Sequence, residues 1–305
     1  MTFLIALLFL GLAVGASANC KCDTMKWATC DGTPCECTLL VDDGVKQKLN
    51  CNTLIPKCYL MKGESYRASK GQDTRIIGGK PVESAFLDND GIYDPDCENN
   101  GTFKARQCNN TDVCWCVNSA GVRRTDKGDK TLKCEKLVET YWLRLQLTHE
   151  PVEGGIDEKL LKPALAAAIK KRYNFDTKLV DEVQYDPDAN LILVDVKKEI
   201  GERQTDLTTM AYYMEKDVKV LPLFKDQEKF EPVVGTKTLK LNKILVYYVD
   251  EENPTFTMKA LTGGIIAVIV VVVLAVIAGL LVVFFARRRE QQKYSKAQPR
   301  ELETM

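Results

Sequence analysis

Two long apolar runs interrupt a chain in which hydrophobic and polar positions otherwise alternate over short distances. The first run extends from Phe3 to Val14 and is followed by Ala16-Ser17-Ala18. Small residues at this spacing form the pattern that signal peptidase cleaves. We therefore predict a signal peptide over residues 1–18, with Asn19 as the first residue of the mature chain.

The second run, from Gly263 to Ala286, contains no charged residue. As a helix rising about 1.5 Å per residue it covers roughly 36 Å, enough to cross a hydrocarbon core of about 30 Å. Arg287 to Arg289 follow it, whereas Lys259 alone precedes it closely, and such an excess of positive charge marks the cytosolic side. The prediction is one transmembrane helix over residues 262–286 in type I orientation, with a cytoplasmic tail over residues 287–305.

Shorter periodicities between the two runs predict strands and helices. Every second residue from Tyr141 to Leu147 is Tyr or Leu, which is typical of a strand with one buried face, here Thr140 to Thr148. Leu191 to Val196 and Ile244 to Val249 are two further apolar runs of strand length.

Two sets of apolar residues recur at helical spacing: Leu161, Leu165, Ala168 and Ile169, and then Leu207, Met210, Ala211 and Met214. Pro163 is best tolerated in a first helical turn, so we place the start of the first helix near Lys162. Strands mixed with helices predict an α+β membrane-proximal domain over residues 135–256.

All twelve cysteines lie between Cys20 and Cys134. In a secreted chain an even number of cysteines predicts six disulfides, each contributing about 3 kcal/mol. These bonds replace the hydrophobic core that a short, polar stretch cannot build. The absence of cysteine further along predicts a domain boundary near Cys134.

The cysteines separate into two sets of six, which predict a small disulfide-rich domain over residues 19–57 and a second over residues 58–134. A zinc site is disfavoured, because the close cysteine pairs have one residue between them and no histidine accompanies them. The spacing alone leaves fifteen possible pairings within each set of six.

The charges exclude one class of function and the histidine content argues against another. Lys plus Arg and Asp plus Glu are equal at 42 each, so no basic field exists to hold nucleic acid. His149 is the only histidine, and we expect it to be a partly exposed structural residue at a strand end. Serine and cysteine proteases need a histidine beside the nucleophile, so we predict no catalytic residues, no enzyme and no cofactor.

The second cysteine set contains Gln107-Cys108, Val113-Cys114-Trp115-Cys116-Val117, Gly121 and Cys134. This Q-C…C-W-C-V string resembles the thyroglobulin type-1 repeat. The resemblance implies the disulfides Cys58–Cys97, Cys108–Cys114 and Cys116–Cys134.

The whole chain resembles the family of the epithelial cell adhesion molecule and the trophoblast cell-surface antigen. The matching stretches are Asp88 to Cys97, Cys114 to Asp126, Ala211 to Lys219, Tyr247 to Glu251 and Ile265 to Val273. For the first cysteine set the resemblance implies the pairs Cys20–Cys35, Cys22–Cys51 and Cys30–Cys37. The expected fold is therefore multidomain, with two disulfide-rich domains, an α+β domain and one transmembrane helix.

The same resemblance implies an adhesion and signalling glycoprotein at the lateral or junctional plasma membrane of epithelial cells. It implies cis homodimers in which the thyroglobulin-type loop packs on the cysteine-free domain of a neighbour. It also implies processing by membrane serine proteases and sheddases, and contact with claudins through a small-xxx-small step, for which Ala275 and Gly279 are the candidates. A membrane-tethered inhibitor of cathepsins is the alternative, because isolated thyroglobulin type-1 repeats can enter the clefts of cysteine cathepsins.

Three surface features complete the expectations. Arg75 and Ile76 lie in a polar, Gly-rich stretch and are a candidate cleavage site, the alternative being an uncut loop held by Cys58–Cys97. Asn100 and Asn109 each begin an acceptor sequence for N-glycosylation. The tail is too short to fold and carries lysines beyond its three arginines, so we expect it to lie on the anionic inner leaflet.

Overall fold

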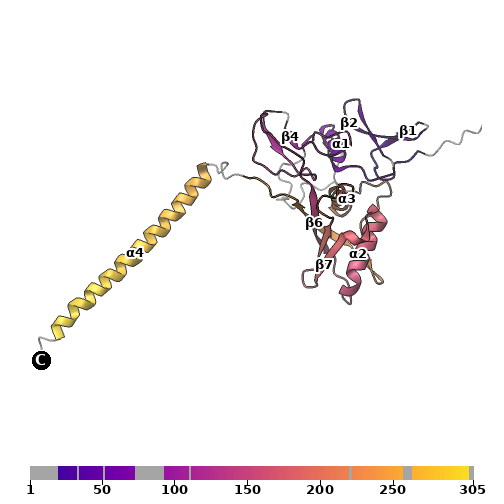
Figure 1. Ribbon diagram of the computed structural model, residues 1–305. Coiled ribbons are helices and arrows are strands. Elements are labelled where there is room, and N and C mark those ends of the chain that lie inside the picture. The colour runs from indigo at the N-terminus through magenta and orange to yellow at the C-terminus, as the bar shows by residue number, and fades with distance from the viewer. Residues whose placement is uncertain are drawn as a thin grey trace, which may run out of the picture. The chain divides into compact units, whose positions relative to one another are not determined.

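The computed structural model describes residues 20–32, 34–50, 52–72, 93–109, 111–219, 222–256 and 263–301. The chain divides into one compact unit that ends at Thr255 and a second unit that begins at Phe256. The second unit contains α4 (Gly263–Glu301), and the first contains every other described element (Figure 1). The predicted signal peptide and the predicted cleavage residues Arg75 and Ile76 lie outside the described residues.

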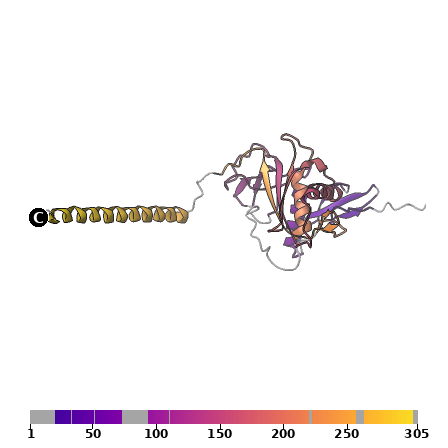
Figure 2. The ribbon, with the colours of Figure 1, turned by 90° about the horizontal axis from the view of Figure 1, so that it is seen from below.

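The first cysteine-rich part is a small antiparallel sheet with a helix packed against it. The strands β1 (Thr29–Asp31), β2 (Glu36–Asp42) and β3 (Val45–Leu49) follow one another in the sheet, which lies at one end of the compact unit in Figure 2. The helix α1 (Lys57–Ser69) crosses β2 closely. A Cβ atom on Gly63 would lie 2.7 Å from Leu39 Cδ2, so only glycine permits this approach.

The second cysteine-rich part is built around the hairpin of β4 (Arg106–Cys108) and β5 (Cys114–Cys116). Trp115 is buried and meets Tyr93 edge to face, with ring centroids 5.4 Å apart. Phe103 is equally buried and lies under Gly121, which has a positive φ of 75°. Few apolar side chains are buried in this part, so the disulfides contribute much of its stability.

The cysteine-free part contains a four-stranded antiparallel sheet in the order β11-β6-β8-β7. Its strands are β6 (Thr140–His149), β7 (Val180–Asp186), β8 (Leu191–Lys197) and β11 (Leu241–Asp250). Leu143, Leu145 and Leu147 are fully buried, as the alternation in the sequence predicts. The short elements η1 (Thr177–Leu179), β9 (Val233–Val234) and β10 (Lys237–Thr238) complete this part.

The helix α2 (Glu158–Tyr173) begins four residues before the predicted start, so that prediction was wrong. Asp157 caps the helix by accepting a hydrogen bond of 3.0 Å from Lys159 N, as a carboxylate at this position usually does. Pro163 therefore lies inside the helix. It removes one hydrogen bond to the carbonyl of Lys159, but Lys159 is exposed and water can replace the missing donor.

The helix α3 (Leu207–Lys219) is buried on almost every side. It packs on β6 and β11 of the sheet and also on α1. In Figure 1 it lies between the elements of the cysteine-rich parts and the sheet. We call the cysteine-rich parts together, residues 20–134, and the cysteine-free part, residues 135–255, the two halves of the compact unit. The helix α3 forms the core of the junction between them.

The helix α4 is longer than a membrane requires. Its segment Ala267–Arg289 is apolar enough to span a bilayer, and an 18-residue window within it has a mean hydropathy of 3.5. The helix then continues through the positively charged residues to Glu301, so the expectation that the tail does not fold was wrong. The tail residues before Pro299 are mostly good helix formers, and a helix already nucleated in the membrane segment needs no new nucleus to extend.

Candidate interaction surface and domain junction

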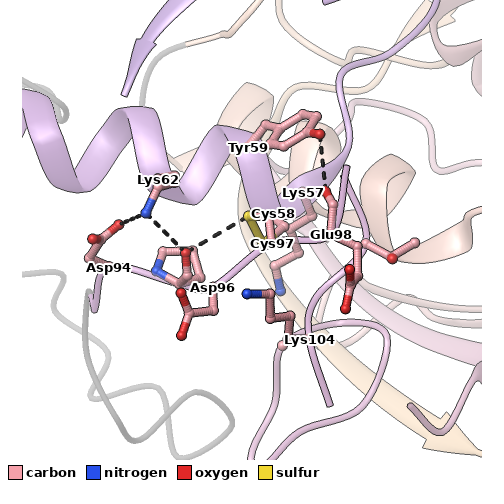
Figure 3. Close-up of a disulfide and its surroundings, with 12 residues drawn as sticks. Lys57, Cys58, Tyr59, Lys62, Asp94, Asp96, Cys97, Glu98 and Lys104 are labelled. Atoms are coloured by element: carbon pink, nitrogen blue, oxygen red, sulfur yellow. Dashed lines mark hydrogen bonds and ion pairs between the residues drawn. A yellow bond between two sulfur atoms is a disulfide. The ribbon is translucent and has the colours of Figure 1, made fainter. Parts of the chain in front are cut away.

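Four disulfides staple the cysteine-rich parts: Cys20–Cys35, Cys58–Cys97, Cys108–Cys114 and Cys116–Cys134. These are four of the six pairs that the family resemblance implies. Around Cys58–Cys97 (Figure 3), Lys62 of α1 donates to Asp94 over 2.8 Å, and the hydroxyl of Tyr59 donates to the carbonyl of Glu98 over 3.1 Å. The disulfide and these hydrogen bonds fix the segment after Tyr93 onto α1.

The other two implied pairs are absent from the structure. Cys22 and Cys30 carry free thiols, whereas Cys37 is disulfide-bonded to a cysteine other than Cys30. Cys51, the implied partner of Cys22, lies outside the described residues. Cys30 faces Cys37 across β1 and β2, with 3.0 Å between the Sγ atoms, so the implied pair is within reach. The pairs Cys22–Cys51 and Cys30–Cys37 therefore stay predictions.

The four-stranded sheet has one face against which no described helix packs. The helices α2 and α3 cover the face that carries Leu143, Leu145 and Leu147. The alternate residues point to the opposite face, where most of them are half-buried. We call this the open sheet face, and its residues are Trp142, Arg144, Gln146 and Thr148 of β6, Leu191, Leu193, Asp195 and Lys197 of β8, and Lys243, Leu245, Tyr247 and Val249 of β11.

An arginine–carboxylate pair lies at the middle of the open sheet face. The Nε and Nη2 atoms of Arg144 each donate to a different oxygen of Asp195 over 2.8 Å. These hydrogen bonds hold the pKa of Asp195 below its ordinary value, although partial burial opposes them. The guanidinium of Arg144 and the ammonium of Lys197 also lie 5.2 and 4.5 Å from the ring centroid of Trp142, which is the range of a cation–π contact.

A buried ion pair joins α1 to α3. The Nζ atom of Lys216 donates to both carboxylate oxygens of Glu64, at 2.6 and 2.8 Å, and the hydroxyl of Tyr212 donates to the same carboxylate. Both charged side chains are at most one-tenth exposed. Removing either partner would leave a buried charge without compensation, so this contact specifies how the halves dock.

The first turn of α1 is capped from the other half of the compact unit. Pro56, which precedes the helix, supplies no side-chain hydrogen bond. Instead the hydroxyl of Thr209 accepts from Lys57 N over 2.9 Å, and the hydroxyl of Tyr213 accepts from Ile55 N over 3.2 Å. Burial raises the pKa of Tyr213 above its ordinary value, so Tyr213 remains a neutral hydroxyl at physiological pH.

The loop that follows the Cys-Trp-Cys-Val string is the third contact between the halves. Ser119 N donates to the carbonyl of Val138 over 2.8 Å, and the hydroxyl of Ser119 accepts from Thr140 N over 2.9 Å. Asn118 donates to Asp250 at the end of β11 over 2.9 Å. Burial raises the pKa of Asp250 above its ordinary value, and the hydrogen bonds that its carboxylate accepts oppose that shift.

His149 is buried, with 2% of its surface exposed, so the expectation of a partly exposed histidine was wrong. Its Nδ1 atom lies 2.7 Å from the carbonyl oxygen of Glu150, and the ring stacks on Tyr185. Its Nε2 atom has no hydrogen-bond partner. The ring points inward because it continues the alternation of Leu143, Leu145 and Leu147 along β6.

The remaining candidate residues lie apart from these contacts. Asn100 and Asn109 are exposed, and the Thr of each acceptor sequence donates its hydroxyl to the Asn side chain. Ala275 and Gly279 lie one turn apart on α4. No sequence signal pointed to α1 or to the β1–β3 sheet, because their importance depends on contacts between distant segments.

A secreted-type disulfide framework, joined to a mixed α/β unit and to one membrane-spanning helix, defines a single-pass cell-surface protein. A family model described as EPCAM/Trop-2, C-terminal matches residues 140–250, and the model of the thyroglobulin type-1 repeat matches residues 72–134. The similarity extends over whole chains. Epithelial cell adhesion molecule of Homo sapiens is 44% identical over 299 residues, covering 95% of this chain and 91% of the relative.

Tumor-associated calcium signal transducer 2 of Rattus norvegicus is 41% identical over 307 residues, covering 98% of this chain and 95% of the relative. Epithelial cell adhesion molecule of Mus musculus is 41% identical over 296 residues, covering 94% of this chain and 90% of the relative. The chain belongs to the EpCAM/Trop-2 family, a family of cell-surface adhesion and signal-transducing proteins.

Proposed function

We propose that this chain is an epithelial adhesion and signalling glycoprotein that forms cis dimers through the open sheet face. The observation that carries the proposal is this face itself, which combines half-buried apolar residues with an aromatic–arginine centre and is covered by no described helix. A second copy of the chain is the proposed occupant, with its thyroglobulin-type domain against the sheet.

The chemistry of the open sheet face suits a protein partner. Leu193 of β8 and Leu245 and Tyr247 of β11 supply apolar surface on the two sides of β6. Trp142 and Arg144 of β6 are of the residue types that most often dominate binding energy. Lys197 and Lys243 lie toward its ends, as in an interface with a polar rim.

Light scattering on the soluble unit, residues 19–255, across a dilution series tests the dimer. We expect a dimer that persists to low micromolar concentration, and a monomer when Leu193→Glu places a charge on the open sheet face. Ala167→Glu is the matched control, because Ala167 is exposed on α2 and away from this face. A wild-type monomer at every concentration would end the dimer proposal and direct attention to the membrane helix.

We propose further that the chain is cleaved by proteases and N-glycosylated. Cleavage between Arg75 and Ile76 by a membrane serine protease, followed by shedding of the ectodomain, is the expected route. Exposure of Asn100 and Asn109 supports glycosylation at both. Peptide mapping of the protein secreted from epithelial cells, with and without glycosidase, tests both modifications.

Within the membrane we propose that Ala275 and Gly279 let a claudin helix approach α4, which would place the protein at the lateral, junctional surface. Small residues one turn apart permit close packing of two helices. Crosslinking of claudins to the wild-type chain but not to Gly279→Leu would support this contact. Equal crosslinking of claudins to the wild-type chain and to Gly279→Leu would contradict the proposed contact.

The cathepsin-inhibitor alternative gains no support from the contacts of the thyroglobulin-type domain. Its loop after Cys-Trp-Cys-Val is engaged by Val138, Thr140 and Asp250 of the same chain. Nanomolar inhibition of a cathepsin by residues 19–255 would nevertheless favour that alternative. We infer no catalytic activity for the chain.

A further inference from the structure

The segment that leads from the compact unit toward the membrane helix is held by the thyroglobulin-type domain. We call Glu251–Thr255 the stalk, since it follows β11 and closes the compact unit. Its first amide, Glu251 N, donates to the carbonyl of Glu139 over 2.9 Å, and its last, Thr255 N, donates to the carbonyl of Arg124 over 2.9 Å. Thr255 and Thr125 thereby form a parallel bridge.

The side chain of Arg124 donates to three acceptors, one at the end of β11 and two in the stalk. Its Nε atom donates to Asp250 over 3.0 Å, and its Nη2 atom donates to the carbonyl oxygens of Glu252 and, over 3.0 Å, Asn253. The side chains of Arg124 and Asp250 are 11% and 10% exposed. Water therefore competes weakly for these bonds. Loss of the guanidinium would leave the buried Asp250 carboxylate without its cationic partner and would remove this donor from two stalk carbonyls.

Asp250 is itself fixed from two directions. It accepts from Asn118 of the thyroglobulin-type domain over 2.9 Å and from the hydroxyl of Thr140 over 2.8 Å. The carboxylate is thus the point at which β6, the thyroglobulin-type domain and the beginning of the stalk meet. A rigid acceptor at this point lets Arg124 hold the stalk in one position.

The position of Arg124 is set by a covalently closed loop. Arg124 lies between Cys116 and Cys134, which form a disulfide. Its backbone N–H donates to the carbonyl of Cys116 over 2.8 Å, and the hydroxyl of Thr125 accepts from Cys116 N over 3.0 Å. Arg124 is therefore held in a covalently closed loop, whereas the stalk is held by noncovalent contacts, namely hydrogen bonds and the ion pairs Arg203–Glu251 and Lys136–Glu252.

We propose that Arg124 is a latch that controls the access of proteases to the stalk. A protease binds its substrate as an extended strand, so Glu251–Thr255 must leave the thyroglobulin-type domain before it can be cut. The rate of cutting then follows the fraction of molecules in which the latch is open. The thyroglobulin-type domain thereby restrains cleavage of the same chain beside the membrane.

The full chain in phosphatidylcholine nanodiscs, treated with a glutamyl endopeptidase, tests the latch, because this protease cuts after glutamate and the stalk contains Glu251 and Glu252. Mass spectrometry of the membrane-bound fragment gives the cleavage rate within Glu251–Thr255. Arg124→Gln should raise that rate about tenfold or more, and Arg124→Lys should give an intermediate rate because one ammonium cannot serve all three acceptors. A glutamyl endopeptidase is not a physiological sheddase, so this result is independent of whether the proposed shedding occurs.

Arg172→Gln is the matched control. Arg172 is also 11% exposed and pairs with a buried aspartate, Asp217, but it lies between α2 and α3 and does not touch the stalk. The Arg172→Gln variant should lower the melting temperature and leave the rate of stalk cleavage within about twofold of wild type. Local opening of the stalk does not depend on contacts that are distant from it. Equal stalk cleavage in Arg124→Gln and Arg172→Gln would overturn the latch. Light scattering in parallel separates latch opening from any change of assembly.

If Arg124→Gln does not fold, amide hydrogen exchange of the unmodified chain tests the latch instead. Glu251 and Thr255 should exchange at least about tenfold more slowly than an unstructured peptide, because both amides are bonded. Exchange at the rate of an unstructured peptide would overturn the latch whatever the variants do.

Discussion

The cysteine-rich and cysteine-free halves of the compact unit are stabilised by different means. Residues 20–134 form short strands and one helix that are tied by disulfides, whereas residues 135–255 form a four-stranded sheet over which two helices pack. Covalent bonds act largely by restricting the unfolded chain, and burial acts by removing apolar surface from water. Yet α3 is buried between the halves, so neither should unfold alone.

The largest expected effect concerns the covalent half. Cys58–Cys97 closes a sequence separation of 39 and Cys108–Cys114 one of 6. In the loop-entropy description, replacing the first pair by alanine should cost about 4 kcal/mol and replacing the second about 2 kcal/mol. Urea unfolding of the two double variants measures the difference, and equal costs would show that native packing around these bonds outweighs chain entropy.

The corresponding change in the burial half is Leu145→Ala. Leu145 is fully buried in the middle of β6, and removing its side chain should cost about 3 kcal/mol in lost burial and cavity formation. Gln146→Ala, one residue further and on the open sheet face, is the control and should change stability by less than about 1 kcal/mol. Chemical unfolding measures both, and similar costs for the two variants would contradict the assignment of the faces.

A third change tests whether the halves unfold together. Lys216→Met leaves Glu64 buried without its cationic partner and should cost about 3 kcal/mol. It should also separate the unfolding of the halves, which single-tryptophan variants can follow, because Trp115 lies in one half and Trp142 in the other. Lys219→Met, whose lysine pairs with Glu215 one turn away, is the control. Coincident transitions in Lys216→Met would mean that other contacts of α3 suffice.

The smallest expected effect is a pH dependence. Arg144 lowers the pKa of Asp195, so the stability contributed by Asp195 is present above the unfolded value of about 3.8 and is lost as the pH falls through the lower folded value. Asp195→Asn should therefore destabilise by about 1 kcal/mol at pH 7, a modest figure because Arg144 is partly exposed and screened. The gap from wild type should close in acid, and melting temperatures across pH measure it.

Asp250 should behave with the opposite sign. Burial raises its pKa, so its contribution is present below the unfolded value and is lost as the pH rises through the folded value. Asp250→Asn should therefore show its greatest loss of stability relative to wild type in acid. The same loss at pH 3 and pH 7 would mean that the hydrogen bonds, rather than the titration, dominate at this site.

Sequence patterns predicted the regular elements best where a period persisted over many residues. The strands β6, β8 and β11 and the helix α3 were found to within a few residues, because alternation and helical spacing report directly on a buried face. The start of α2 was missed because the prediction was based on Pro163 alone, whereas Asp157 caps the helix. The alternation along β6 indicated that one side of this strand faces outward. The sequence did not show which strands lie beside β6, so it did not predict the open sheet face.

The sequence by itself determined the apolar segment that spans the membrane, the two cysteine sets and the periodicity of the larger half, since each depends on residues that are close together. The tertiary structure alone decided that α3 lies under α1, that His149 is buried and that Arg124 meets Asp250 across 126 residues. It also decided which cysteines in the first set are bonded. Such pairings depend on how distant segments pack, and no local period or propensity carries that information.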